Sequence, residues 1–412
     1  MEFSLCDGAF LISGESFAHW KVKGAAGIVF ILTGIQTGNR GNFFTRESSK
    51  KGECLGKVNR FMVVLVDNML WLNNFKFSIR RRIGMKKGMG VVVLIGLMMV
   101  GISGMASIAS AEDFEMVYIP KLVGIPWFNE QEKGLKDYAE EAGGLKVTVV
   151  GAPDPDPASQ ARILEDAIAK KPDCIMVVPN DTASLEPIMK KGMDAGILMM
   201  AQEGMSMQNM AADVEFMIID GVGKSMADGL IKAVGPKGGY AMMVGSLTVE
   251  MHNLWADAVE KYLAENYPDM KQVTSRVEGS ESVEKAHDKT LELVKAYPEL
   301  SGIVYIGSLG GIGGAQAVEE KGIEDKLAVI AMSLPSQAKP YLEDGSMKAC
   351  FIGHPYKIGK DSAYIAKQLL DGVKPDEITE LPESGEVTLD GKVFLFDSFR
   401  EVTVENADSF GF

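Results

Sequence analysis

The sequence is poor in the residues that most often perform catalysis or hold metal ions. Its 412 residues include four histidines and four cysteines, and neither a His-Glu-x-x-His nor a Gly-x-Ser-x-Gly motif occurs. Cys174 and Cys350 lie in apolar, strand-like runs. This favours two small buried hydrophobic residues, and a disulfide between them stays open. No catalytic group, metal site or cofactor is therefore expected, and the protein is predicted not to be an enzyme.

Phosphate-binding motifs are missing as well. The glycine-rich run 307–314 follows a strand-like segment and precedes a helix-like one, but it lacks the Gly-Lys-Ser/Thr ending of a phosphate-binding loop. Its glycines also lack the spacing of the dinucleotide fingerprint. We interpret the run as close packing of the start of a helix on a sheet.

Residues 85–111 have the three parts of a secretory signal peptide. Basic residues follow Met85, an uncharged apolar run extends from Val91 to Met105, and Ala109-Ser110-Ala111 ends the segment. The run is short for a membrane span, which needs about 20 residues. We expect export and cleavage after Ala111. Residues 1–84, which precede this signal, are then expected to be a mis-annotated or non-structural extension or, alternatively, a long presequence.

Without residues 1–111 the chain is strongly acidic. That segment carries 14 of the 42 Lys and Arg residues and 6 of the 56 Asp and Glu residues, so the net charge changes from −14 to −22. Such a chain repels phosphate backbones. Nucleic acid is therefore not expected as a partner.

The remaining 301 residues alternate short apolar runs with amphipathic stretches. This alternation predicts an α/β fold with parallel sheets covered by helices on both faces. About ten strand-like runs favour two doubly wound open-sheet lobes joined by a hinge over a single sheet. Near the end, Asp390-Gly391 separates two β-type runs, which predicts a C-terminal β-hairpin.

Polar residues follow many of the predicted strands, where ligands bind in sheets of this kind. They are Lys121, Asn180, Asp181, Gln202, Glu203, Ser246, Glu278, Ser308, Ser333 and His354. Trp127 and Phe128 follow the first strand closely. Aromatic faces beside carboxylates and amides suit a sugar, because they pack on C–H groups while the polar groups bind hydroxyls.

Several segments resemble the type I periplasmic sugar-binding proteins of ABC transporters. The run 118–128, Tyr-Ile-Pro-Lys-Leu-Val-Gly-Ile-Pro-Trp-Phe, is similar to their opening, where an Asn-Pro-Phe-Phe-like element stacks on the sugar. Residues 119–124 look nearest the autoinducer-2-binding branch, with rhamnose-type binders as near relatives. The likeness covers nearly all of 115–412. It includes Thr248-Val249, Asn253-x-Trp255, Leu293-x-Lys-Ala-Tyr297, Ala315-Gln316-Ala317, Pro340-Tyr341 and Gly359-Lys360.

The resemblance implies a periplasmic monomer that captures a small sugar or sugar-like ligand between its lobes for an ABC permease. It also leaves open a sensory ligand-binding protein for a receptor kinase, or autoinducer-2-type signal uptake. The lobes are expected to comprise residues 112–219 with 335–372, and 220–334 with 373–412. The hinge is expected near Asp220 and Ser333.

The family's ligand residues carry over in part. Its ligand Lys corresponds to Lys121 and its acidic ligand to Glu203, whereas its Asp-Gln pair falls on Met251-His252. Its Pro and Ala contacts fall near Ile306 and Ser308. These departures favour a different sugar or a polyol over the autoinducer. The expected ligand-binding residues are Lys121, Trp127, Phe128, Gln202, Glu203, His252, Ser308 and His354.

Overall fold

The computed structural model describes residues 2–6, 9–13, 19–23, 29–33 and 113–412. The chain divides into two compact units, Met1–Ala106 and Ser107–Phe412. In the first unit the strands pair in the order β1-β2-β4-β3, with bounds Glu2–Cys6, Ala9–Ser13, Val29–Thr33 and His19–Lys23. The expected signal peptide and its cleavage site lie outside the described residues. The mis-annotation of residues 1–84 stays a prediction.

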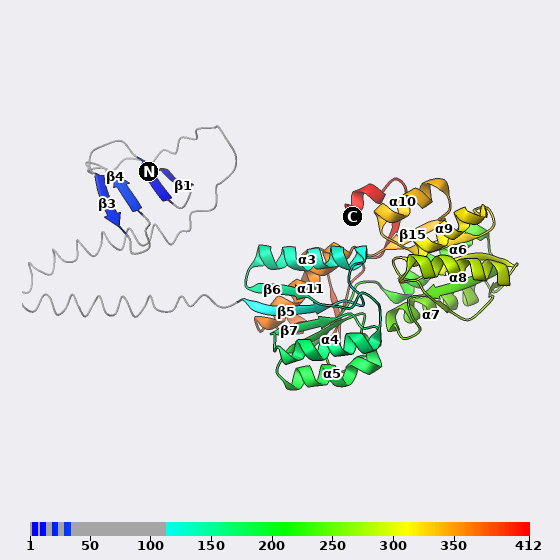
Figure 1. The fold of residues 1–412 in the computed structure, drawn as a ribbon, viewed down its shortest axis with the longest axis horizontal. Coiled ribbons are helices and arrows are strands. Elements are labelled where there is room, and N and C mark those ends of the chain that lie inside the picture. Colours follow the sequence, from blue (N-terminus) through cyan, green and yellow to red (C-terminus); the bar gives the residue numbers. More distant parts are fainter. Residues whose placement is uncertain (1, 7–8, 14–18, 24–28, 34–112) are drawn as a thin grey trace, which may run out of the picture. The chain divides into compact units, whose positions relative to one another are not determined.

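The second unit has two lobes, each built on a seven-stranded sheet (Figure 1). The first lobe has the strand order β18-β19-β9-β8-β7-β5-β6. Its strands are β5 (Phe114–Ile119), β6 (Leu145–Val149), β7 (Cys174–Val177), β8 (Leu198–Gln202), β9 (Ala212–Glu215), β18 (Thr388–Asp390) and β19 (Val393–Leu395). Helices α3 (Pro126–Ala142) and α11 (Pro355–Leu370) pack together on one face, and α4 (Pro157–Ala169) and α5 (Thr182–Asp194) on the other.

The second lobe has the strand order β11-β10-β13-β14-β15-β20, and β12 also pairs with β10. Its strands are β10 (Gly238–Val244), β11 (Met270–Gln272), β12 (Val277–Glu278), β13 (Leu300–Tyr305), β14 (Ala328–Met332), β15 (Ala349–Ile352) and β20 (Arg400–Val402). Its helices are α6 (Ile219–Val234), α7 (Glu250–Asn266), α8 (Val283–Ala296), α9 (Gly310–Lys321) and α10 (Pro335–Asp344). The pair β16 (Glu380–Leu381) and β17 (Gly385–Glu386) and the short helices η1 (Pro375–Glu377) and η2 (Ala407–Phe410) complete the chain.

These sheets follow from near-continuously apolar strands. Every residue of β7, β14 and β15 is apolar and buried, as expected for parallel strands covered on both faces. The predicted two-lobed α/β fold is confirmed, and so is the hairpin, since β18 and β19 pair antiparallel on either side of Gly391. Cys174 and Cys350 are buried and free, one in each lobe.

The glycine-rich run packs as the sequence indicates. A Cβ atom at Gly311 would lie 2.1 Å from the Ala331 Cβ, and one at Gly314 would lie 2.4 Å from the Tyr305 ring. Only glycine lets α9 approach β13 and β14 this closely. The interpretation as helix-on-sheet packing is therefore confirmed.

The expected division of the chain into lobes needs two corrections. Residues 335–352, assigned to the first lobe, form α10 and β15, and β15 pairs parallel with β14 in the second sheet. Residues 388–395, assigned to the second lobe, form the hairpin, whose strand β19 pairs with β9 in the first sheet. The strand–helix–strand unit keeps β15 beside β14, so the chain does not leave the second sheet at Ser333.

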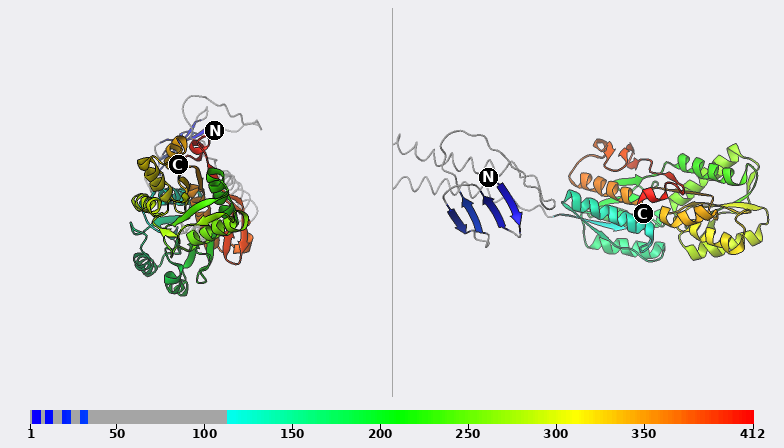
Figure 2. Two further views of the ribbon diagram at one scale, coloured as in Figure 1. Left: turned by 90° about the vertical axis from the view of Figure 1, so that its right-hand side faces the viewer. Right: turned by 90° about the horizontal axis from the view of Figure 1, so that it is seen from above.

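The chain instead crosses between the lobes three times. The crossovers lie at residues 216–218, at Gly353-His354 and at 396–399. In Figure 2 the C-terminal segment, in red, lies at the junction of the two lobes.

Strand β9, just before the first crossover, buries two carboxyl groups. Asp213 and Glu215 are 0% exposed and lie two residues apart, hence on one face of the sheet. Asp213 Oδ1 accepts a hydrogen bond from the Gly204 N–H at 3.2 Å, whereas neither Glu215 oxygen has a partner in the described part of the chain. Burial raises the pKa of both carboxyl groups, and the Asp213 charge raises the pKa of Glu215 further.

Replacing Glu215 with Gln should raise the unfolding free energy, and more at pH 8 than at pH 5. The folded state binds the proton of Glu215 more tightly than the unfolded chain does. The protonated Glu215 is therefore compatible with folding at low pH, and the folded state loses stability as the pH rises above about 4. Urea denaturation should show a gain of about 1–3 kcal/mol at pH 8, since Gln cannot ionise. Glu386→Gln, exposed on β17, is the control. Equal gains at both pH values would contradict the prediction.

Candidate functional site

A pocket lies in the cleft between the lobes, where the carboxyl ends of both sheets meet. It holds about 420 Å³ of space free of protein atoms, part of it open to solvent. Six of the eight residues expected to bind ligand line it, namely Lys121, Trp127, Phe128, Glu203, His252 and Ser308. The strand-end rule selects Lys121, Glu203 and Ser308 of these. His252 is expected from the family resemblance.

Lys121 follows β5 and is only 3% exposed. Its ammonium group forms an ion pair with the carboxylate of Glu203, which is 4% exposed. The Lys121 carbonyl accepts a hydrogen bond from Asn180 Nδ2 at 2.8 Å, which fixes the end of the strand. A buried ammonium group requires such a partner, because burying an isolated charge is very costly.

Glu203 has an unusual backbone conformation directly after β8. Its φ of +61° lies in the left-handed region, which residues other than glycine seldom adopt. The Glu203 N–H still donates to the Val214 carbonyl at 3.4 Å, so the turn starts while the strand is paired. This turn directs the Glu203 side chain to Lys121. Strain of this kind occurs mostly at functional sites.

His252 brings the second lobe into the same cluster. It lies in the first turn of α7 and is 3% exposed, and its Nε2 is 3.2 Å from Lys121 Nζ. Its Nδ1 accepts a hydrogen bond from the Gly245 N–H at 3.1 Å, so the neutral ring carries its proton on Nε2. Burial and the nearby Lys121 charge lower the His252 pKa well below its ordinary value. His252 therefore presents a neutral N–H donor to the pocket, and its 3.2 Å approach to Lys121 Nζ is a contact between two donors and not a hydrogen bond.

Glu281 is the charged lining residue that sequence reasoning missed. It lies between β12 and α8, its side chain is 8% exposed, and its Oε1 is 3.5 Å from His252 Nε2. Burial raises the Glu281 pKa to about 7, against the lowering effect of Lys121. The residue named instead, Glu278, accepts hydrogen bonds from Ser246 Oγ at 2.9 Å and Leu247 N–H at 2.8 Å, and is exposed. Only the Ser282 cap of α8 marks Glu281 in the sequence.

Aromatic side chains form the other walls of the pocket. Trp127 and Phe128 begin α3 and are 7% and 4% exposed. The Trp127 ring centroid lies 5.9 Å from that of Phe216 on the first crossover, and Phe216 lies 6.4 Å from Trp255 of α7. Trp255 also stacks on His252 at 5.9 Å. Its Nε1 is buried without a hydrogen-bond partner among the described residues.

Two expected ligand residues do not line the pocket. Gln202 precedes Glu203 on β8, and successive side chains of a strand point to opposite faces. Its side-chain oxygen accepts a hydrogen bond from Gln131, which in turn accepts one from the Tyr118 hydroxyl at 2.7 Å. His354 lies on the second crossover, where its ring packs 4.6 Å from that of the C-terminal Phe412.

The fold and the pocket agree with a family match. The periplasmic binding protein domain family matches residues 116–374 of the chain. The chain belongs to this family. The family resemblance found in the sequence motifs is thereby confirmed. Members of the family are solute-binding proteins.

Relatives of this periplasmic binding protein include the D-ribose/D-allose-binding protein of Pseudomonas aeruginosa, 25% identical over 282 residues, which span 64% of this chain and 86% of the relative. LsrB from Clostridium saccharobutylicum in complex with AI-2 shares the fold with a TM-score of 0.65, 22% identity, and coverage of 72% of this chain and 100% of that chain. An ABC transporter solute-binding protein from Clostridium phytofermentas with bound L-rhamnose also shares the fold, with a TM-score of 0.66 and 20% identity. The match covers 73% of this chain and 98% of that chain.

The two lobes of this periplasmic binding protein touch beside the pocket. Glu250, in the first turn of α7, accepts hydrogen bonds from the Ser206 N–H at 3.0 Å and its hydroxyl at 2.7 Å. The Thr248 hydroxyl donates to the Asn180 carbonyl at 2.9 Å. Both contacts join the first lobe to the second, so the structure shows the cleft closed over its polar cluster.

Other kinds of site find no support in the described ranges. No group of three or more His, Cys, Asp or Glu residues among them could hold a metal ion. None of the helices described there has the length and apolar character needed to cross a bilayer.

The Glu281 carboxyl group should titrate near neutral pH in the periplasmic binding protein domain. Carboxyl ¹³C NMR should show a midpoint at about pH 7 that disappears in Glu281→Gln, because burial disfavours the charged form. Glu278→Gln, exposed and three residues away, should leave that midpoint in place. An unchanged set of titrations in Glu281→Gln would contradict the assignment.

Proposed function

We propose that the protein captures a small neutral sugar or sugar-like ligand in the pocket between its lobes and delivers it to an ABC permease. The observation that carries this proposal is the buried cluster of Lys121, Glu203 and His252. These three residues come from two lobes, and they converge on one cavity walled by aromatic rings.

The polar cluster offers both kinds of hydrogen bond that sugar hydroxyls make. Lys121 and the His252 Nε2–H donate, and the Glu203 carboxylate accepts. The Glu281 carboxyl group accepts or donates according to its protonation. A hydroxyl group donates and accepts at once, so a polyhydroxylated ligand uses such a mixed set fully. Bonds to charged partners are about twice as strong as neutral ones.

The aromatic walls suit the carbon skeleton of a sugar. Trp127 and Phe128 on the first lobe face a cavity that Trp255 closes on the second. In this proposal Trp127 and Phe128 stack on the sugar ring. Relatives with this fold are described with AI-2 and L-rhamnose, and a curated relative as binding D-ribose and D-allose. These names support a sugar-like ligand without selecting one.

Binding in this proposal is coupled to closure of the lobes. The three crossovers form the hinge, and the Ser206–Glu250 and Thr248–Asn180 contacts hold the closed cleft. A ligand that bridges Lys121 on one lobe and His252 on the other stabilises the closed form, which a permease distinguishes from the open form.

Cellular placement is part of the same proposal. The signal peptide at residues 85–111 exports the chain, cleavage follows Ala111, and the mature monomer works in the periplasm beside an inner-membrane permease. A permease and an ATPase encoded beside the gene favour import. A histidine kinase alone beside it favours a sensory role.

Lys121→Ala should strongly reduce ligand-induced stabilisation. A sugar present well above its Kd raises the melting temperature, because it binds only the folded state. Loss of a charge-assisted hydrogen bond of about 2 kcal/mol should weaken binding about thirtyfold. A thermal-shift screen against pentoses, hexoses, deoxysugars, polyols and the autoinducer, followed by calorimetry of each ligand found, measures both effects.

The matched control for this variant is Lys146→Ala, whose side chain on β6 is 65% exposed. Lys146 pairs with Glu115 at the amino end of β5, whereas Lys121 follows the carboxyl end of that strand. The Lys146→Ala variant should bind like the unsubstituted protein. Lys121→Ala with undiminished affinity would remove the central contact of the proposal.

A further inference from the structure

Strand order in the second lobe sorts the pocket residues by polarity. The lobe has the order β10-β13-β14-β15, with β12 beside β10. His252 and Glu281 follow β10 and β12, Ser308 follows β13, Met332 ends β14 and Ile352 ends β15. Polarity therefore falls steadily across this sheet. Its apolar side is the side on which β15 leads into the second crossover.

The first lobe repeats this gradient from its own sheet. Its order β19-β9-β8-β7-β5 places Phe216 and Met217, which follow β9, next to the crossovers. Glu203 follows β8, and Lys121 follows β5 farther along the sheet. The two lobes therefore bring their charged residues together at one end of the pocket, and the lining residues next to the crossovers are apolar. Trp127 and Phe128 are apolar as well, but they follow β5 like Lys121.

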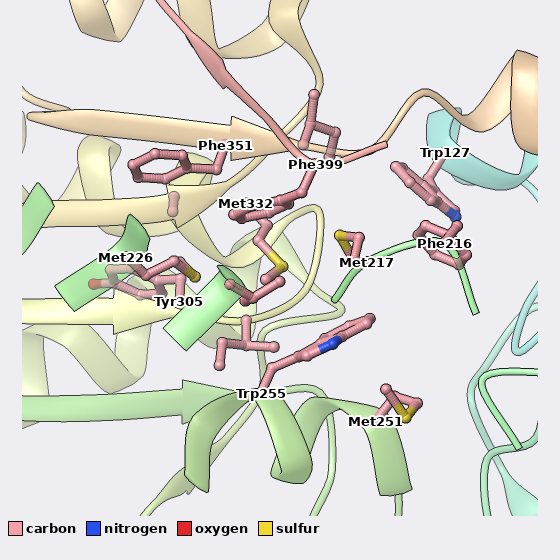
Figure 3. Packing of buried hydrophobic residues seen from close by; sticks show 14 of the residues in the cluster. Trp127, Phe216, Met217, Met226, Met251, Trp255, Tyr305, Met332, Phe351 and Phe399 are labelled. Atoms are coloured by element: carbon pink, nitrogen blue, oxygen red, sulfur yellow. The ribbon is translucent and has the colours of Figure 1, made fainter. Parts of the chain in front are cut away.

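The hinge end presents almost nothing that forms a hydrogen bond through a side chain. Met217 and Met332 are each 4% exposed and Ile352 is 3% exposed. Figure 3 shows Met217 and Met332 gathered between the rings of Trp127, Phe216 and Trp255. Among the lining side chains at this end, the indole N–H groups are the donors and none carries a hydroxyl, amide or charge.

The charged end selects against ionic ligands. Lys121 and Glu203 already balance each other in their ion pair, and His252 is neutral. An anionic ligand would meet the carboxyl groups of Glu203 and Glu281, and a cationic ligand would meet Lys121. Burying an uncompensated charge beside a like charge is strongly unfavourable. The matching ligand is therefore neutral and polar on one side.

We propose that the pocket is built for a 6-deoxyhexose. Its ring hydroxyls face Lys121, Glu203, His252 and Glu281, and its methyl group lies against Met217, Met332 and Ile352. This inference rests on the proposed function of sugar capture and adds the class of sugar. A hexose would place its exocyclic hydroxyl among thioether and aliphatic groups, where only an indole N–H can donate to it and no lining side chain accepts the hydroxyl proton.

Two series of sugars isolate this one group. D-Galactose, D-fucose and L-arabinose share the same ring hydroxyls and differ at carbon 5, which carries CH₂OH, CH₃ or H. L-Mannose, L-rhamnose and L-lyxose form the second series with the same change. Isothermal titration calorimetry of the purified protein with all six sugars measures the contribution of that position, because the remaining contacts are shared within each series.

In the series that binds, the deoxysugar should bind about tenfold or more tightly than the hexose, which buries a hydroxyl whose proton no lining side chain accepts. It should bind about fourfold more tightly than the pentose, which buries one carbon less. A hexose that equals or exceeds its deoxysugar overturns this inference and leaves sugar capture standing. Failure of all six sugars, with another sugar of the thermal-shift screen binding, overturns this inference alone. Failure of every ligand in that screen contradicts the proposed function, and this inference with it.

Met332→Gln tests the apolar end directly. The amide of Gln offers the exocyclic hydroxyl a partner, so the preference for the deoxysugar should fall below about threefold. Met332→Leu has a similar volume and no polar group, and it should keep the full preference. Melting temperatures of both variants check that they fold. If Met332→Gln does not fold, the six sugars on the unsubstituted protein decide the question alone.

Discussion

The buried ion pair of Lys121 and Glu203 constrains the rest of the pocket. Two charges removed from water must meet closely, and each must keep its remaining hydrogen bonds. The structure satisfies this by turning the backbone of Glu203 into the left-handed region and by holding the end of β5 through Asn180. The strand between them, β7, supplies that Asn180, so three neighbouring strand ends serve one contact. A ligand entering here replaces contacts that are already made, which demands matching hydrogen bonds.

Much of the fold could be predicted because it is encoded locally. Apolar strands, amphipathic helices and the Asp390-Gly391 turn each depend on a few adjacent residues. The division into lobes could not be predicted in full, because it depends on pairings between distant segments. Nothing near Val393 indicates that it pairs with Asp213, 180 positions earlier in the chain. Nor does the sequence of β15 show which sheet it joins.

The pocket residues likewise divide into those that local sequence could predict and those that it could not. Lys121, Glu203 and Ser308 follow clear strands, so their convergence could be predicted from the geometry of parallel sheets. Gln202 was assigned wrongly to the pocket because an error of one position along a strand turns a side chain to the other face. Glu281 escaped prediction because the strand-end rule selects Glu278, the last residue of β12, whereas Glu281 lies three positions farther, just before α8. The His354 ring packs against the ring of the C-terminal Phe412, and no local sequence pattern indicates this long-range contact.

The C-terminus has a consequence for work with this protein. The Phe412 ring packs on His354 at the second crossover, and the Phe412 carbonyl accepts a hydrogen bond from the Ser336 N–H at 3.3 Å. Phe412 therefore lies at the crossover that the proposed function takes as part of the hinge. In that case an affinity tag, a fluorophore or a surface linkage attached at Phe412 would interfere with opening and closing of the lobes. A reporter of opening and closing is better attached at the outer end of a lobe, where the same rotation produces the largest displacement.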